Sequence, residues 1–141
     1  IRIERTEKIN CISINNFCLS KNIPQIDYIK IDTQGSEFEI LSGLGKYRPL
    51  IIRAEAQSIE CYKKIKTFEQ IIRLLDEFGY VAVNFEKLDN SVLKLPIFMD
   101  IIFLPKFENY KNSKIINQRK NKFISLLQIF SLQKYLKLYN L

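Results

Sequence analysis

The stretch QIDYIKIDTQGSEFEILSGLG, residues 25–45, decides the fold because it contains a strand, a tight turn and a helix in direct succession. Residues 25–32 have the length of a strand and are rich in β-branched and aromatic side chains. Gly35 lies in the turn that follows, where it can take a positive φ angle. Ser36 and Glu39 have the spacing of a capping box, and apolar residues then recur at helical spacing. The stretch therefore predicts one β-α unit.

The same pattern recurs downstream. Residues 50–56 (LIIRAEA) predict a buried strand, and Thr67 with Gln70 forms a second capping box at the start of the next helix. Two more strand-like runs, 80–85 and 98–105, follow with no helix between them, so they should pair antiparallel. The alternation predicts an α/β fold whose sheet is mostly parallel, with an antiparallel strand near one end.

Residues 106–141 are interpreted as a basic helical tail that follows the body at 1–105 and packs against it or against a partner. The chain has 22 Lys and Arg against 15 Asp and Glu, a net charge of +7, and the whole excess lies in this tail. Its apolar residues fall on two opposite faces of an ideal helix, so one straight helix cannot bury both sets. We therefore expect a break near Ser131. The two sets are Ile116, Phe123, Leu126, Leu127 and Phe130 on one face, and Leu132, Tyr135, Leu136 and Tyr139 on the other.

Composition excludes several classes of site. The chain has three cysteines, no C-x-x-C spacing and no histidine, so neither a zinc site nor a histidine-activated nucleophile is expected. The longest apolar run is far shorter than the ~20 residues of a membrane helix. The basic tail accompanies no nucleic-acid recognition motif, so we expect no nucleic-acid partner and no metal. Reduced cysteines favour a cytoplasmic protein.

The stretch quoted above resembles the signature of the FkbM family of S-adenosylmethionine-dependent methyltransferases. That signature runs as an aspartate, then Lys-Ile-Asp, two residues, Gly, one residue and Glu, followed by a helix that ends in Leu-x-Gly. The matching positions are Asp27, Lys30, Ile31, Asp32, Gly35, Glu37, Leu41 and Gly43. Weaker similarities continue at Arg48-Pro49, Glu55, Tyr62, Phe68, Leu75, 78–80 and 100–103.

The resemblance implies a Rossmann-like class I methyltransferase fold, with S-adenosylmethionine as cofactor and a hydroxyl of a sugar or glycosylated product as acceptor. This chain would supply the fourth to seventh strands and a C-terminal helical extension. Asn15 and Asn16 stand where the family has aspartates, and the family's glycine-rich cofactor loop is missing. Because the chain also begins with Ile1 rather than Met, we expect a C-terminal portion that is inactive alone, with the main cofactor-binding residues unknown.

A second hypothesis comes from a different functional class. The chain could be a non-catalytic interaction module that uses the half-sheet as a scaffold and the basic tail for docking. The outer edge of the strand at 25–32 would then be free to pair, which favours a homo-oligomer formed through this edge or the C-terminal helices.

Three carboxylates should meet at one edge of the predicted sheet. Asp32 ends the first strand, Glu37 lies in the first turn of the next helix, and Glu55 lies near the end of the second strand. In open α/β sheets, ligands bind beyond the carboxyl ends of the strands. A carboxylate there could take the proton of an acceptor hydroxyl or orient that hydroxyl. We therefore expect Asp32 and Glu37 to be catalytic and Glu55 to bind the acceptor.

Each candidate also has a structural explanation. Asp32 could form the turn or cap the helix, Glu37 could interact with the helix dipole, and Glu55 could be the solvated end of a strand. Lys30 and Tyr62 are the two further candidates for acceptor binding. Lys30 could instead form an ion pair, and Tyr62 could instead pack in the core. A divalent metal between Asp32 and Glu37 is chemically possible, but two carboxylates are too few to predict one.

Overall fold

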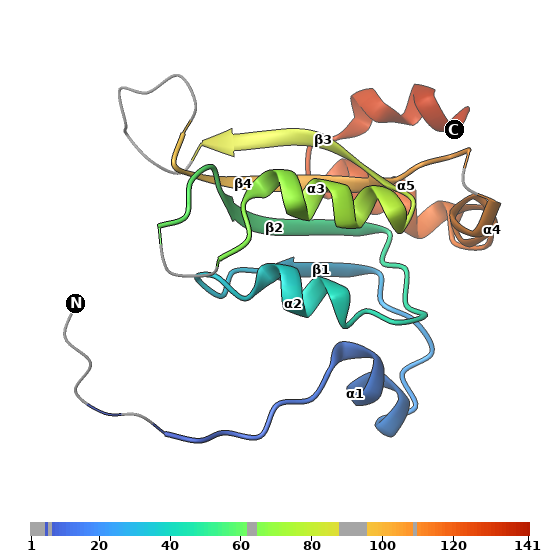
Figure 1. Ribbon diagram of the computed structural model, residues 1–141. Helices are drawn as coiled ribbons and strands as arrows, with labels where there is room; N and C mark the ends of the chain where they lie inside the picture. The colour runs from blue at the N-terminus through green and yellow to red at the C-terminus, as the bar shows by residue number, and fades with distance from the viewer. Residues whose placement is uncertain (1–4, 6, 62–64, 88–95, 109) are drawn as a thin grey trace.

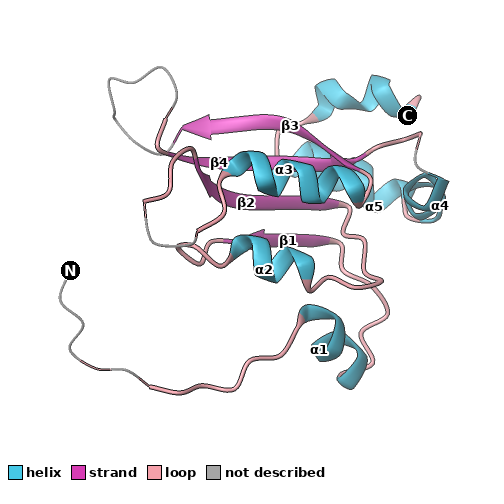
Figure 2. Ribbon diagram, viewed as in Figure 1, coloured by secondary structure: helices cyan, strands magenta, loops and turns pink. Residues whose placement is uncertain are grey.

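The computed structural model describes residues 5, 7–61, 65–87, 96–108 and 110–141, and these form an α/β structure (Figures 1 and 2). The predicted alternation of strands and helices is confirmed. The elements are α1 (Ile14–Ser20), β1 (Tyr28–Ile31), α2 (Glu37–Ser42), β2 (Ile51–Gln57), α3 (Phe68–Glu77), β3 (Tyr80–Lys87), β4 (Phe98–Pro105), α4 (Tyr110–Gln118), α5 (Lys120–Ile129) and the 3₁₀ helix η1 (Gln133–Tyr139).

The turn between β1 and α2 depends on Gly35. Its φ angle is 122°, as predicted, and a Cβ atom there would lie 2.5 Å from Cδ1 of Ile65. The backbone conformation therefore favours glycine, and any larger residue would also have to displace the Ile65 side chain. The predicted capping box of Ser36 and Glu39 is wrong, because within the described residues the Ser36 side chain caps no helical N–H group. The buried carboxylate of Glu37 organises this turn instead.

The four strands form one sheet in the order β1-β2-β4-β3. β1 pairs parallel with β2, whereas β4 pairs antiparallel with both β2 and β3. Thus β1, β2 and β3 point the same way, and the predicted antiparallel pairing of β3 with β4 is confirmed. β4 lies near one end of the sheet, as expected. It is inserted between β2 and β3, however, so only one of the three neighbouring pairs is parallel.

Helices α2 and α3 cover one face of the sheet (Figure 1). Leu41 and Leu75 of these helices are fully buried against Ile52 and Phe103 of the central strands. The predicted capping box at the start of α3 is confirmed, with the Thr67 N–H donating to the side-chain oxygen of Gln70 at 3.1 Å. This core fixes the carboxyl ends of β1 and β2 relative to each other.

The C-terminal helices cover the opposite face of the sheet and build a second core there. The predicted break at Ser131 is confirmed, since this residue has a φ angle of 55° between α5 and η1. The break lets both apolar stripes turn inward, as expected. A second interruption, at Arg119 between α4 and α5, was not predicted. The most deeply buried tail residues are Ile116, Phe123, Leu127, Leu132 and Tyr139, which pack on Leu50, Ile51, Ile102 and Leu104.

Arg119 joins the tail to the start of β1. Its guanidinium is buried and donates to the Asp27 carboxylate at 2.7 Å, to the carbonyl of Ile26 at 3.1 Å and to the carbonyl of Arg48 at 3.1 Å. A charge-assisted hydrogen bond of this kind is stronger than a neutral one when it is shielded from water. Arg119 therefore ties the α4-α5 junction to the two segments that precede β1 and β2.

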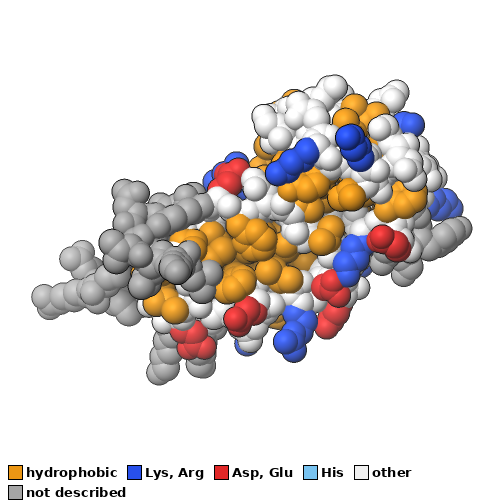
Figure 3. Space-filling model, turned by 90° about the horizontal axis from the view of Figure 1, so that it is seen from above, with side chains coloured by type: hydrophobic (Ala, Val, Ile, Leu, Met, Phe, Trp, Pro, Cys, Tyr) orange, Lys and Arg blue, Asp and Glu red, His pale blue; other side chains and the backbone are white. Residues whose placement is uncertain are grey.

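β3 forms an outer edge of the sheet that is partly apolar. Figure 3, a view from above, shows apolar side chains gathered along this side of the molecule, and Val81 and Phe85 of β3 are 39% and 52% exposed. In the part of the chain that the structure describes, no helix is both long and apolar enough to cross a membrane.

If the second core stabilises the fold, truncating one of its buried leucines should lower the free energy of unfolding far more than truncating an exposed leucine. We expect Leu127→Ala to lower the free energy of unfolding by about 2–5 kcal/mol, because it leaves a cavity. The matched variant Leu138→Ala, at a residue 63% exposed, should change it by less than about 0.5 kcal/mol. Chemical denaturation measures both values. Equal losses would show that α5 does not pack on the sheet.

Candidate active site

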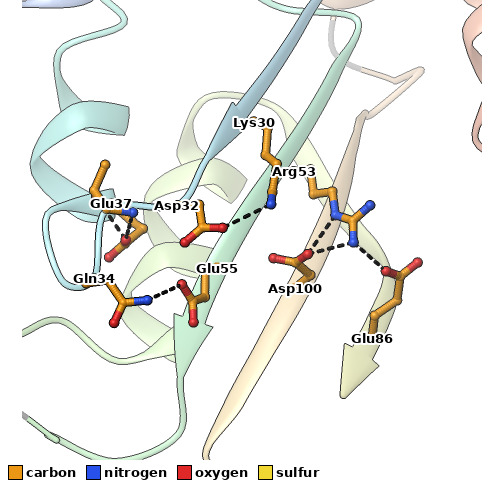
Figure 4. A network of polar contacts seen from close by, with 9 residues as sticks. Lys30, Asp32, Gln34, Glu37, Arg53, Glu55, Glu86 and Asp100 are labelled. Carbon is orange, nitrogen blue, oxygen red and sulfur yellow. Dashed lines mark hydrogen bonds and ion pairs between the residues drawn. The ribbon is translucent and has the colours of Figure 1, made fainter. Parts of the chain in front are cut away.

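The parallel pairing of β1 and β2 brings Asp32 and Glu55 together. Ile31 lies opposite Ala54. The residues that follow them, Asp32 and Glu55, therefore lie next to each other at the same edge of the sheet. Each of the two carboxyl groups influences the pKa of the other. Glu55 is 7% exposed, whereas the side chain of Asp32 is 44% exposed. Figure 4 shows the two side chains next to each other, with Asp32 on the outer side. The predicted meeting of these two carboxylates is confirmed.

The two carboxyl groups have pKa values that are shifted in opposite directions. Burial, followed by the hydrogen bond to Asp32 and the negative charges nearby, raises the pKa of Glu55 to about 7. The pKa of Asp32 lies below its ordinary value, chiefly because of the hydrogen bond from Glu55 and then because of the one from Lys30. Between the two pKa values Glu55 is therefore protonated and Asp32 carries the negative charge.

Two polar side chains hold this pair in place. Lys30 donates from Nζ to the Asp32 carboxylate at 3.0 Å, and Gln34 donates from Nε2 to Oε2 of Glu55 at 3.2 Å. Lys30 thus forms an ion pair, which was the structural alternative to acceptor binding in the sequence analysis. Its contribution to acceptor binding stays a prediction. Tyr62, the remaining candidate for acceptor binding, lies outside the described residues.

Glu37 faces the turn rather than the space in front of Asp32. It is 5% exposed, and its carboxylate accepts hydrogen bonds from the Thr33 N–H at 2.8 Å, the Thr33 hydroxyl at 2.9 Å and the Gly35 N–H at 2.9 Å. These bonds satisfy backbone groups that would otherwise be unpaired beside the helix. They explain the position of Glu37 by structure alone, so its catalytic role stays a prediction without support from the geometry.

An ion-pair network beside this pair was not predicted. Arg53 donates to Asp100 at 2.8 Å and to Glu86 at 2.7 Å, linking β2 to β4 and β3. Asp100 is 3% exposed and lies opposite Glu55 in the sheet. The sequence carried a signal for it, because Arg53 and Asp100 are charged residues inside otherwise apolar strands. Buried charges need partners, so each of them predicts the other.

Other features of the surface lie away from these carboxylates. A hollow of about 360 Å³ between α2 and α3 is lined by residues that include Phe38 and Arg73, and neither Asp32 nor Glu55 lines it. Among the described residues, no group of three or more Cys, Asp and Glu side chains is placed to hold a metal ion.

Comparison with known proteins identifies the family to which this site belongs. The family model described as the methyltransferase FkbM domain matches residues 1–82, more than half of the chain. This chain belongs to the FkbM methyltransferase family. The matched range of the FkbM domain includes Asp32, Glu37 and Glu55 and ends within β3, so the similarity noted at residues 100–103 lies beyond it. No curated protein and no solved structure gives a significant match.

The raised pKa of Glu55 predicts how stability depends on pH. Between about pH 4.5 and 7 the folded chain holds a proton on Glu55 that the unfolded chain has lost, so the free energy of unfolding should fall as pH rises through this window. Glu55→Gln removes the titration. We expect this variant to gain about 1–3 kcal/mol relative to the natural chain between pH 5 and pH 8, measured by denaturation at both pH values.

The control for this measurement is Glu39→Gln, which changes an exposed glutamate on α2. Its stability relative to the natural chain should be the same at pH 5 and pH 8. If Glu55→Gln behaves like Glu39→Gln, the proton is not held on Glu55.

Proposed function

We propose that this chain forms the acceptor side of an S-adenosylmethionine-dependent O-methyltransferase, in which Asp32 accepts the proton of the acceptor hydroxyl. The observation that carries the proposal is the position of Asp32, a half-exposed carboxylate that is paired with Lys30 and lies beside the buried Glu55 at the carboxyl end of a parallel strand. Membership of the FkbM methyltransferase family supports methyl transfer as the reaction.

The strand arrangement supports a Rossmann-like methyltransferase sheet. β1, β2 and β3 run in one direction and β4 is inserted antiparallel between β2 and β3, as expected if these are the fourth to seventh strands of such a sheet. In open α/β sheets, the ligand crevice lies beyond the carboxyl ends of the parallel strands. Asp32 and Glu55 lie at that end.

The residues present fit one part of the proposed cofactor. Asp32 is ionised and Glu55, with its raised pKa, is largely protonated, so the pair offers a single negative charge that suits a cationic group. S-adenosylmethionine carries a sulfonium and an ammonium. The β1-α2 turn does not suit an anionic group, because the Thr33 and Gly35 N–H groups already donate to Glu37. We therefore assign only the cationic part to these carboxylates. When bound, the cofactor supplies an electrophilic methyl group.

Asp32 can act on the hydroxyl although its pKa is depressed. As a hydroxyl oxygen gains a methyl group it becomes strongly acidic, so a weak base within hydrogen-bond reach is sufficient to take its proton. The 44% exposure of the Asp32 side chain leaves an oxygen open to such a hydroxyl, while Lys30 and Glu55 restrict its rotation. Asp32 would thus orient the nucleophilic oxygen first and accept its proton as the new bond forms.

The acceptor in this proposal is a sugar or a glycosylated product. Around Asp32, the polar rim offers the acceptors and donors of Glu55, Gln34 and Lys30, which suit a ligand with several hydroxyl groups. Glu55 and Lys30 would contact the acceptor, in line with their positions beside Asp32.

The variant Asp32→Asn tests the proposal because it removes the proton acceptor and keeps the shape of the side chain. We expect kcat to fall by roughly 10²–10⁴-fold. The assay is transfer of a labelled methyl group from S-adenosylmethionine to a panel of sugar acceptors, carried out on the whole gene product.

The matched control is Asp76→Asn, at an exposed aspartate of α3 paired with Lys106. Its rate should stay within about twofold of the natural protein. Full activity in Asp32→Asn, with circular dichroism showing both variants folded, would rule out Asp32 as the proton acceptor.

A further inference from the structure

The face of the sheet that carries Glu55 continues into a second polar cluster. Side chains alternate between faces along a strand, so Gln57 lies on the same face as Glu55. Asp100 lies opposite Glu55 on β4 and therefore shares that face too. Gln57 and Asp100 are each 3% exposed. The cluster therefore lies directly beside the Asp32–Glu55 pair.

Two buried oxygen atoms of this cluster lack a donor. Within the described part of the chain, neither Oε1 of Gln57 nor Oδ1 of Asp100 accepts a hydrogen bond, and both atoms are enclosed. Buried polar atoms are nearly always paired, and an unpaired one in a folded protein requires an explanation. Two such atoms on one face, next to a candidate active site, indicate a place that a donor-bearing ligand completes.

Arg53 determines which oxygen of Asp100 remains available. Its guanidinium donates to Oδ2 of Asp100 and, through the other arm, to Glu86. In Figure 4, the other oxygen of Asp100 points away from Arg53, toward the side occupied by Asp32 and Glu55. Arg53 therefore orients Asp100 so that its free oxygen faces the candidate active site.

The chemistry of the cluster defines the ligand class. Both free atoms are acceptors, so the ligand must offer O–H or N–H groups. Asp32, Asp100 and Glu86 outweigh the charges of Lys30 and Arg53, which disfavours an anionic ligand. Gln57 and Asp100 are diagonal neighbours across β2 and β4, which places their backbones roughly 7–8 Å apart. One sugar ring with neighbouring hydroxyl groups can span that distance.

We propose that Asp100 and Gln57 recognise the acceptor, by accepting hydrogen bonds from two hydroxyl groups of a neutral sugar or polyol, and that Arg53 is a positioning residue for Asp100. The inference rests on the function proposed above and adds the residues that select the acceptor.

Kinetics of the whole gene product separate recognition from chemistry. Asp100→Asn keeps an oxygen for Arg53 and replaces the free acceptor by a donor. It should therefore raise KM for a neutral sugar acceptor by about tenfold or more and leave kcat nearly unchanged. Asp76→Asn is the matched control and should change neither constant. If Asp100→Asn leaves KM unchanged while Asp32→Asn lowers kcat, the recognition role is wrong and the proposed function stands. If Asp32→Asn has no effect, the proposed function itself fails.

A binding measurement tests the inference independently of activity. The natural chain is titrated with methyl α-D-glucopyranoside and, separately, with glucose 6-phosphate, while NMR follows the side-chain amide of Gln57. We expect a saturable shift with the neutral glucoside, a weaker one with the phosphate, and loss of the shift in Asp100→Asn. A Gln57 amide that does not move with either probe would show that these oxygens are satisfied by water only and would overturn the proposal.

Discussion

The side-by-side placement of Asp32 and Glu55 is the constraint on which the candidate site depends. It exists because β1 and β2 are parallel and in a register that places these two residues at the same edge of the sheet. A shift of one residue would move one of the two side chains to the other face, and the pair would be lost. This placement raises the pKa of the buried Glu55 and accompanies a lowered pKa of the exposed Asp32.

The packing around the sheet holds this register from both sides. α2 and α3 cover one face, and the C-terminal helices cover the other face over the half of the sheet far from the carboxylates. β1 pairs with β2 alone among the described strands, so it needs support at its start. The Leu50 N–H donates to the Asp27 carbonyl at 2.9 Å, and Arg119 binds the Asp27 side chain at 2.7 Å. The tail thus contacts the residue just before β1, the strand that Asp32 follows.

Much of the fold could be predicted from the sequence because its signals are local. Gly35, the capping box at Thr67 and the opposed apolar faces around Ser131 act over a few residues, and the structure confirms all three. The insertion of β4 between β2 and β3 could not be predicted, because strand order depends on contacts between residues far apart in the chain. The capping box at Ser36 was wrong: the Ser36 side chain caps no helical N–H group, and the turn is held instead by the buried Glu37, which accepts the N–H groups of Thr33 and Gly35.

The candidate site, like the fold, was only partly predicted from the sequence. Asp32 and Glu55 meet because strand ends of a parallel pair always share an edge, so their sequence positions were sufficient. Glu37 was grouped with them by proximity in sequence, yet its side chain turns into the loop. Arg53, Glu86 and Asp100 come from three strands, and only the fold shows that they form one network. Their charges, placed within apolar strands, were a signal that a partner must exist.

The most direct measurement of the central claim is a ¹³C NMR titration of the side-chain carboxyl groups in the folded chain. If the two adjacent carboxyl groups interact, Glu55 should titrate near pH 7, Asp32 should titrate below its ordinary value, and Asp32→Ala should lower the pKa of Glu55. If both groups titrate near their ordinary values and Glu55 does not respond to Asp32→Ala, the two carboxyl groups do not interact, and the candidate site loses its basis.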